Sequence, residues 1–222
     1  MPNYFTQDFH DFFIELAANN HKDWMDLNKK RYTKSVKEAF ENFVEALILE
    51  LSNFDTELSL KASDAIFRIN RDIRFSADKT PYKTNRTALI SKYGRKDKVY
   101  PGFYLFLSPE KCMVGGGVYF LEKENLYKVR QEISYNLEEF QALIDEKNFK
   151  ANFPEILGEK GKVLPKEFQE DAKKQQLLFN KGFYYMKDLS PNIIFEEDAV
   201  QQLAAILKSA HNFNLFLRRA LS

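Results

Sequence analysis

The stretch FYLFLSPEKCMVGGGVYF, residues 103–120, decides the fold class of this chain. Two short runs rich in aromatic and β-branched residues, 103–107 and 112–120, flank Pro109-Glu110-Lys111, which is typical of a short turn. Similar runs occur at residues 66–69 and 87–93. Because strands joined by short turns pair antiparallel, these runs together predict an antiparallel sheet.

Helical periodicity surrounds this predicted sheet. Apolar residues spaced i, i+3, i+4, i+7 indicate a helix near residues 6–18, with Thr6 as the N-cap, and a second helical run over about 22–51. Later in the chain we expect helices at about 124–134, 137–147, 172–180 and 198–217, an irregular segment over 148–168, and a strand at 183–186.

The expected architecture is therefore α+β. It is a single domain with an antiparallel sheet of about four to five strands, flanked by N-terminal and C-terminal helices. Residues 1–60 are expected to be helical, residues 61–120 to form the sheet and a cationic loop, and residues 121–222 to be mainly helical.

Composition narrows the class of protein. The single cysteine, Cys112, excludes an internal disulfide and fits a reducing compartment. No window approaches ~18 unbroken apolar residues, so we expect a cytoplasmic protein that does not span a membrane. His10, His21 and His211 are scattered along the chain, so neither a metal site nor a cofactor is expected. The oligomeric state cannot be deduced from the sequence.

Residues 68–83, RINRDIRFSADKTPYK, concentrate charge beside apolar residues. Over residues 68–98 ten basic residues face three acidic ones, whereas the rest of the chain has 23 basic and 29 acidic residues. Pro81 disfavours a helix through residues 78–83, so residues 71–84 are interpreted as an ordered loop leaving a strand. A local positive field on a slightly acidic body favours an anionic partner.

The cations of this loop predict an anion-binding site. Arginine can grip phosphate or carboxylate in a planar, bidentate manner, and the candidate anion-binding residues are Arg68, Arg71, Arg74, Lys79 and Lys83. The candidate supporting residues are Asp72, Asp78, Tyr82, Gly115, Gly116 and Gly117. Five cations against two carboxylates leave a surplus, which a ligand or solvent must compensate. At least one arginine should pair with Asp72 or Asp78 as a stability residue, because its removal would leave a buried acid unpaired.

Three functions fit these residues. The first is the binding of a phosphate-bearing small molecule in an Arg/Lys-lined pocket, and whether that molecule is also processed stays open. The second is nucleic-acid binding through the basic surface of residues 68–98. The third is a structural or interaction role with an internal Arg–Asp network. No residue pattern identifies a reaction, because Ser76-Ala77-Asp78-Lys79 lacks the partner motifs of S-x-x-K enzymes.

Two features remain open at this stage. The glycine triplet at 115–117 weakens a strand, which indicates a bulge, close packing, or the approach of a ligand. Its spacing matches neither a P-loop nor a dinucleotide fingerprint. Four tyrosines lie near the cationic segment in the sequence, where a polar tip is useful: Tyr82, Tyr100, Tyr104 and Tyr119.

The run of residues 68–84 resembles the signature of an uncharacterised family, domain of unknown function 2461. Pro101-Gly102-Phe103-Tyr104 and the glycine triplet are similar to its next two motifs. The Phe-rich first helix with Asn19-Asn20, Trp24 and Tyr32 also resembles that family, as do residues 126–130. The resemblance spans essentially the whole chain and implies one domain, but it implies no activity.

Overall fold

Four antiparallel strands form the sheet in a computed structural model that describes residues 3–222. In order across the sheet they are β1 (Arg86–Ile90), β2 (Gly102–Leu107), β3 (Cys112–Val118) and β4 (Phe183–Leu189). Tyr104 of β2 pairs with Leu89 of β1 and with Gly115 of β3, which pairs with Met186 of β4. The predicted α+β class with an antiparallel sheet is confirmed.

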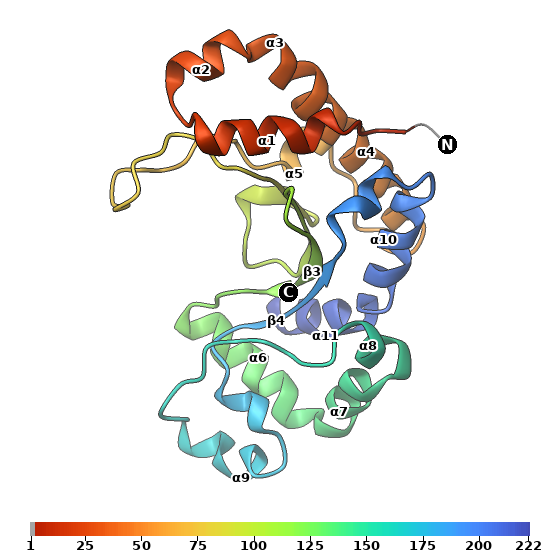
Figure 1. Cartoon of the computed structure of the whole chain (residues 1–222). Coiled ribbons are helices and arrows are strands. Elements are labelled where there is room, and N and C mark those ends of the chain that lie inside the picture. The colour runs from red at the N-terminus through yellow and green to blue at the C-terminus, as the bar shows by residue number, and fades with distance from the viewer. Residues whose placement is uncertain (1–2) are drawn as a thin grey trace.

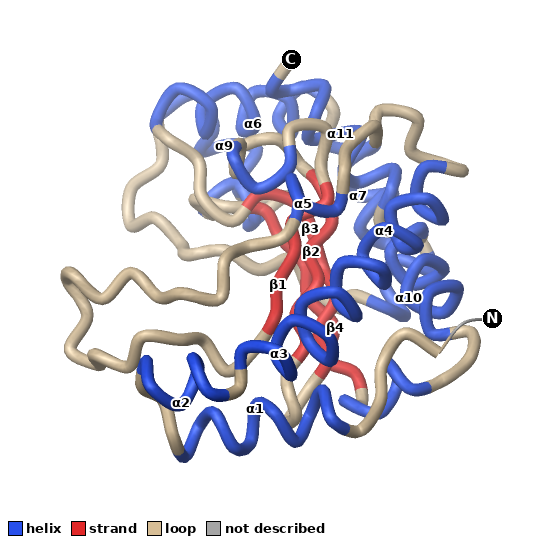
Figure 2. The backbone as a smooth tube through the Cα atoms, turned by 90° about the horizontal axis from the view of Figure 1, so that it is seen from above, coloured by secondary structure: helices blue, strands red, loops and turns tan. Residues whose placement is uncertain are grey.

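The N-terminal helices pack against one side of this sheet. They are α1 (Asp8–Ala18), α2 (Lys22–Leu27), α3 (Lys29–Arg31), the π-helical η1 (Tyr32–Glu38), α4 (Ala39–Ser52) and α5 (Ala62–Ala65). Figure 2 shows the strands edge-on, with α4 and α10 (Ala199–Lys208) on one side and mainly loops on the other. We call the side away from α4 and α10 the open face of the sheet.

The C-terminal half adds helices around the end of the sheet where β3 leaves it (Figure 1). Besides α10 these are α6 (Lys123–Tyr135), α7 (Leu137–Asp145), α8 (Lys147–Asn152), α9 (Gln169–Ala172) and α11 (His211–Leu221). Short 3₁₀ segments connect the elements: η2 (Gly94–Lys96), η3 (Lys166–Phe168), η4 (Gln176–Phe179) and η5 (Pro191–Phe195).

Several predicted boundaries are wrong. The long helix predicted over 198–217 is two helices, α10 and α11, and the helix predicted over 172–180 is replaced by α9 and η4. The irregular segment 148–168 contains most of α8, and residues 66–69 contain one isolated bridge, from Ile66 to Ala88, instead of a full strand. Thr6 does not cap α1, because Gln7 holds that position. Helix propensities of single residues are weak, so tertiary packing can override the boundaries that a local pattern predicts.

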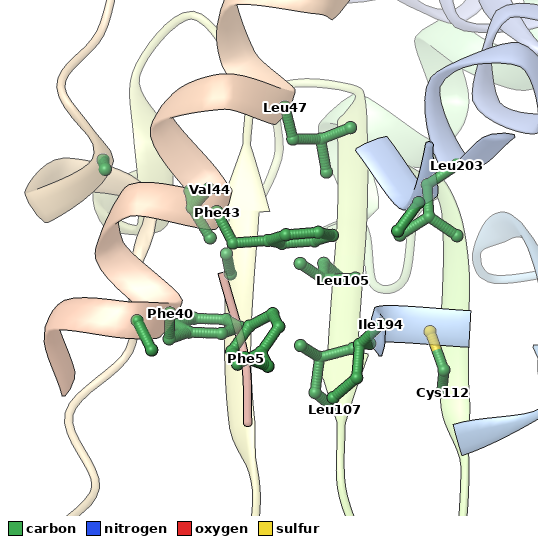
Figure 3. Close-up of a cluster of buried hydrophobic side chains, with 14 of the residues drawn as sticks. Phe5, Phe40, Phe43, Val44, Leu47, Leu105, Leu107, Cys112, Ile194 and Leu203 are labelled. Carbon is green, nitrogen blue, oxygen red and sulfur yellow. The ribbon is translucent and has the colours of Figure 1, made fainter. Parts of the chain in front are cut away.

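Strand alternation sends one set of side chains into the core. Leu105 and Leu107 of β2 are fully buried. In Figure 3, Leu105 lies toward Phe43 of α4 and Leu203 of α10, and Leu107 lies beside Phe5 and Ile194. Burying one such side chain contributes about 1.5–3 kcal/mol. A second buried cluster joins the far end of β3 and β4 to the C-terminal helices α6, α7, α8 and α11. The core therefore occupies the helical side and leaves the open face to the loops.

A buried ion pair holds α11 against the segment that leads into β2. Arg218 donates from its two terminal nitrogens to the two carboxylate oxygens of Asp55, at 2.8 and 2.6 Å. The two side chains are only 5% and 1% exposed. The Nε atom of Arg218 donates to the carbonyl of Pro101 at 3.0 Å. This clamp fixes the start of β2, next to the loop that carries Lys98.

Candidate functional site

Two adjoining cavities lie at the open face of the sheet. One, of about 550 Å³, lies at the base of residues 68–83 and is lined by Arg71, Thr80 and Lys83 among others. The other, of about 360 Å³, is lined mainly by aromatic and apolar side chains. Tyr104 lines both cavities, so they are neighbours across one tyrosine ring. We call them the polar cavity and the aromatic cavity.

Residues 68–83, which we call the basic arm, project from the sheet as the yellow loop at the left of Figure 1. Its two sides run antiparallel: the N–H of Arg71 donates to the carbonyl of Pro81 at 2.9 Å, and that of Lys83 to Ile69 at 2.8 Å. Asn20, after α1, donates to the carbonyl of Tyr82 and accepts from its N–H, at 2.9 and 3.1 Å. The base of the arm is therefore fixed to both the helices and the sheet.

Arg71 is neutralised within the arm. Its guanidinium pairs with Asp78 and donates to the hydroxyl of Thr80 at 2.7 Å. The pKa of Asp78 is lowered to about 2, first by hydrogen bonds from the backbone and hydroxyl of Thr80 and then by Arg71. Asp78 therefore stays ionised and is a poor general base. Arg71 reaches the polar cavity already paired.

Arg74 and Lys79 are also satisfied away from the cavities. Arg74 forms a bidentate pair with Asp72, at 2.9 and 2.7 Å, and its side chain is 75% exposed. Lys79 donates to the carbonyl of Ile73 at 2.9 Å. Neither residue lines the polar or the aromatic cavity. The expectation that removing a paired arginine leaves a buried acid is wrong here, because Asp72 and Asp78 are both about half exposed.

Three cations near the cavities have no acidic partner within residues 3–222. Lys83, Arg68 and Lys98 make no ion pair or hydrogen bond with a carboxylate there, although Arg68 lies close enough to Asp72 to lower its pKa. Burial lowers the pKa of the half-buried Lys83, and the charges of Arg86, Arg68 and Lys98 lower it further. The Lys83 ammonium lies 5.6 Å from the ring centre of Phe67. Positive charge is therefore in excess at this point.

Arg86 adds a fourth positive charge on the side of the sheet that α4 covers. Its side chain is buried, and its Nε atom has no hydrogen-bond partner. The guanidinium lies 5.3 Å from the ring centre of Phe40. Arg86 lines neither cavity, so its contribution to the site is through its field.

The glycine triplet serves close packing within the sheet. A Cβ on Gly116 would lie 2.3 Å from the carbonyl oxygen of Gly102 and 2.4 Å from the hydroxyl of Tyr185. Gly117 has a φ of +85°, which a side chain would strain. The strand pairing is continuous through all three glycines, so the bulge interpretation is wrong and the packing interpretation holds. Gly116 and Gly117 also line the aromatic cavity.

The structure brings only part of the predicted set together. Arg71 and Lys83 line the polar cavity with Tyr82 and Asp78, whereas Gly116 and Gly117 line the aromatic cavity. No sequence pattern marked the other residues that line the aromatic cavity, which are Phe67, Leu89, Lys98, Tyr184 and Met186. Strand alternation could have placed Leu89 and Met186 on the same face of the sheet. It could not have predicted which face of the sheet lacks helices.

Metal ligands, membrane-spanning helices and a reactive thiol are three further features that bear on function. Within residues 3–222, no group of three or more His, Cys, Asp or Glu side chains is placed to hold a metal ion. In the same part of the chain, no helix is long and apolar enough to cross a membrane. The pKa of Cys112 is raised to about 12 by burial, so its thiol is a poor nucleophile.

The chain belongs to a family described as conserved hypothetical protein (DUF2461), whose match covers residues 8–216. This match includes both cavities and the whole basic arm. Comparison with curated proteins and with solved structures found no match.

Proposed function

We propose that this member of the DUF2461 family binds a phosphate-bearing small molecule at the polar cavity, with Lys83 as the principal phosphate contact. Lys83 carries the proposal because its half-buried ammonium lies near other cations and pairs with no carboxylate among the described residues. It lies at the wall of a cavity of about 550 Å³, and Asp78, the acidic residue in that wall, is already paired with Arg71. That volume lies within the usual range of ligand sites.

The charge balance supports an anion at this position. Bringing Lys83 near Arg68 and Arg86 costs free energy that a bound phosphate would offset. Arg71 and Thr80 lie at the same cavity, held by hydrogen bonds that keep their donors in place before a ligand arrives. Asn20 fixes the backbone beside them.

The two other candidate functions have weaker support. Nucleic-acid binding along residues 68–98 would draw on Arg71 and Arg74, but both already have aspartate partners. A purely structural network accounts for those two arginines, but it leaves Lys83, Arg68 and Lys98 without partners among the described residues. The structural network therefore does not explain the surplus charge.

The test is the affinity for inorganic phosphate, measured by calorimetry or NMR titration at constant ionic strength. Lys83→Met should weaken binding by roughly 10-fold or more, because a charge-assisted hydrogen bond contributes about 1.5–3 kcal/mol. Lys79→Met is the matched control, since it removes the same charge from the same arm but outside the cavity. We expect it to change affinity less than about 3-fold.

Two results would contradict the proposal. One is the absence of phosphate binding to the unmodified protein at millimolar concentration. The other is an equal loss in the Lys83 and Lys79 variants, which would indicate a diffuse effect of net charge. Retardation of DNA or RNA in a gel shift, falling steeply between low and moderate salt, would instead favour the nucleic-acid function.

A further inference from the structure

The aromatic cavity next to the polar cavity has a different chemical character. Its volume of about 360 Å³ is walled by Phe67, Leu89, Tyr104, Tyr119, Tyr184 and Met186. These residues come from the segment just before the basic arm, three strands of the sheet and the loop after β3. Among the described residues, Lys98 is the only charged one in its lining. Such a cavity suits an apolar body, not a second free anion.

The geometry of the walls favours a planar group. The rings of Tyr119 and Tyr184 lie 5.0 Å apart between centres and are tilted by 51°. Gly116 and Gly117 line the cavity on β3, so no side chain rises from the sheet there. A flat ring system placed on this bare stretch of strand can contact aromatic side chains at its edges, an arrangement that aromatic groups prefer.

The position of the two cavities links them to one ligand. Tyr104 lines both, and the ammonium of Lys83, in the polar cavity, lies 5.6 Å from the ring centre of Phe67, in the aromatic cavity. An anion at Lys83 therefore lies within one side chain's length of an apolar recess. Lys98, which lines the aromatic cavity, adds positive charge close to the same anion.

We infer that the aromatic cavity binds the planar aromatic body of the ligand whose phosphate lies at Lys83, so that the ligand class is a small aryl-type organophosphate. This inference rests on the proposed function and adds the chemical nature of the group that carries the phosphate. The phosphate supplies the charge that Lys83 and its neighbours lack, and the ring supplies the apolar surface that the cavity walls match.

The test compares 1-naphthyl phosphate with inorganic phosphate by titration calorimetry. The unmodified protein should bind 1-naphthyl phosphate at least about 10-fold more tightly, because burying one ring system removes considerable apolar surface from water. Leu89→Trp, which fills the cavity, should abolish this advantage and leave the affinity for inorganic phosphate within about 2-fold. Leu49→Trp, at a 70% exposed position on α4, is the control and should change neither affinity.

A second variant guards against misfolding of the first. Tyr119 is 76% exposed, so Tyr119→Ala should fold normally and still reduce the 1-naphthyl phosphate advantage at least about 3-fold. Equal affinity of the unmodified protein for the two phosphates would overturn the inference and leave the proposed function standing. An advantage that survives both cavity variants would also overturn it. If neither phosphate binds, the proposed function is wrong and the inference falls with it.

Discussion

Replacing Arg218 by alanine should destabilise the protein severely, although Arg218 lies far from both cavities in the sequence and lines neither. Its guanidinium makes two hydrogen bonds to Asp55, at 2.8 and 2.6 Å, one to Glu57 at 3.1 Å and one to the carbonyl of Pro101 at 3.0 Å. Asp55 is only 1% exposed, so the variant leaves a carboxylate buried without its partner.

The magnitude follows from that burial. Breaking a buried pair by removing one partner costs about 3–5 kcal/mol, because the remaining charge cannot regain its hydration. For a chain of this size 1 kcal/mol corresponds to a shift of roughly 2–4 °C in the melting temperature. The expected loss is therefore about 6–20 °C. Removing both partners with Asp55→Leu and Arg218→Met should recover much of it, since no unpaired charge remains.

The assay is thermal and urea unfolding followed by circular dichroism. Arg219→Ala is the matched control: the neighbouring residue on α11 pairs with Glu132 and Glu139, but its side chain is 48% exposed. Exposed pairs contribute about 0–1 kcal/mol, so the control should melt within a few degrees of the unmodified protein. Equal losses in the Arg218 and Arg219 variants would refute the reasoning, because burial would then have no effect on the outcome.

Three further predictions follow from the same structure. Gly116→Ala should lower the free energy of unfolding in urea by about 1–3 kcal/mol, because its Cβ would meet the Gly102 carbonyl oxygen at 2.3 Å. Gly161→Ala is the control and should be nearly neutral, because its Cβ would meet nothing nearer than 3.4 Å. Equal losses in the two variants would contradict the packing argument. The Asp78 carboxyl should titrate near pH 2 by NMR. Because folding lowers its pKa from 3.8, the stability that Asp78 contributes is complete above about pH 4 and is lost as the pH falls toward 2. A titration midpoint near pH 4 would show that its hydrogen bonds do not form in solution. The Cys112 thiol, with a pKa of about 12, should react with a disulfide reagent only after denaturation, so rapid reaction of the native protein at pH 8 would contradict its burial.

The cations of the basic arm differ in whether they have an acidic partner. Arg71 and Arg74 lie within a few residues of an aspartate and are paired with it. Lys83 is fixed by its backbone bond to Ile69, and its side chain forms no ion pair within residues 3–222. The residue most useful to an anionic ligand is therefore the one whose charge the arm itself does not balance.

Local sequence pattern determined the class of the fold. The alternating, β-branched and aromatic runs at 103–107 and 112–120 predicted β2 and β3, and the turn between them required antiparallel pairing. The helical period near residues 6–18 predicted α1 within two residues. These features depend on neighbours in the chain, so the sequence carries them directly. It also indicated that Asp72 or Asp78 would neutralise an arginine of the arm, because such partners lie within a few residues.

Only the tertiary structure decided which surface is left for a ligand. The aromatic cavity joins Phe67 to Tyr184 and Met186, and the clamp joins Asp55 to Arg218; both connect residues more than a hundred positions apart. The predicted helix over 198–217 divides into α10 and α11, so that α10 packs on α4 while α11 packs on α6 and closes the clamp. Periodicity reports that a strand has two faces, but which face the helices cover depends on packing between distant segments. That long-range choice leaves one face of this sheet open beside the unpaired Lys83.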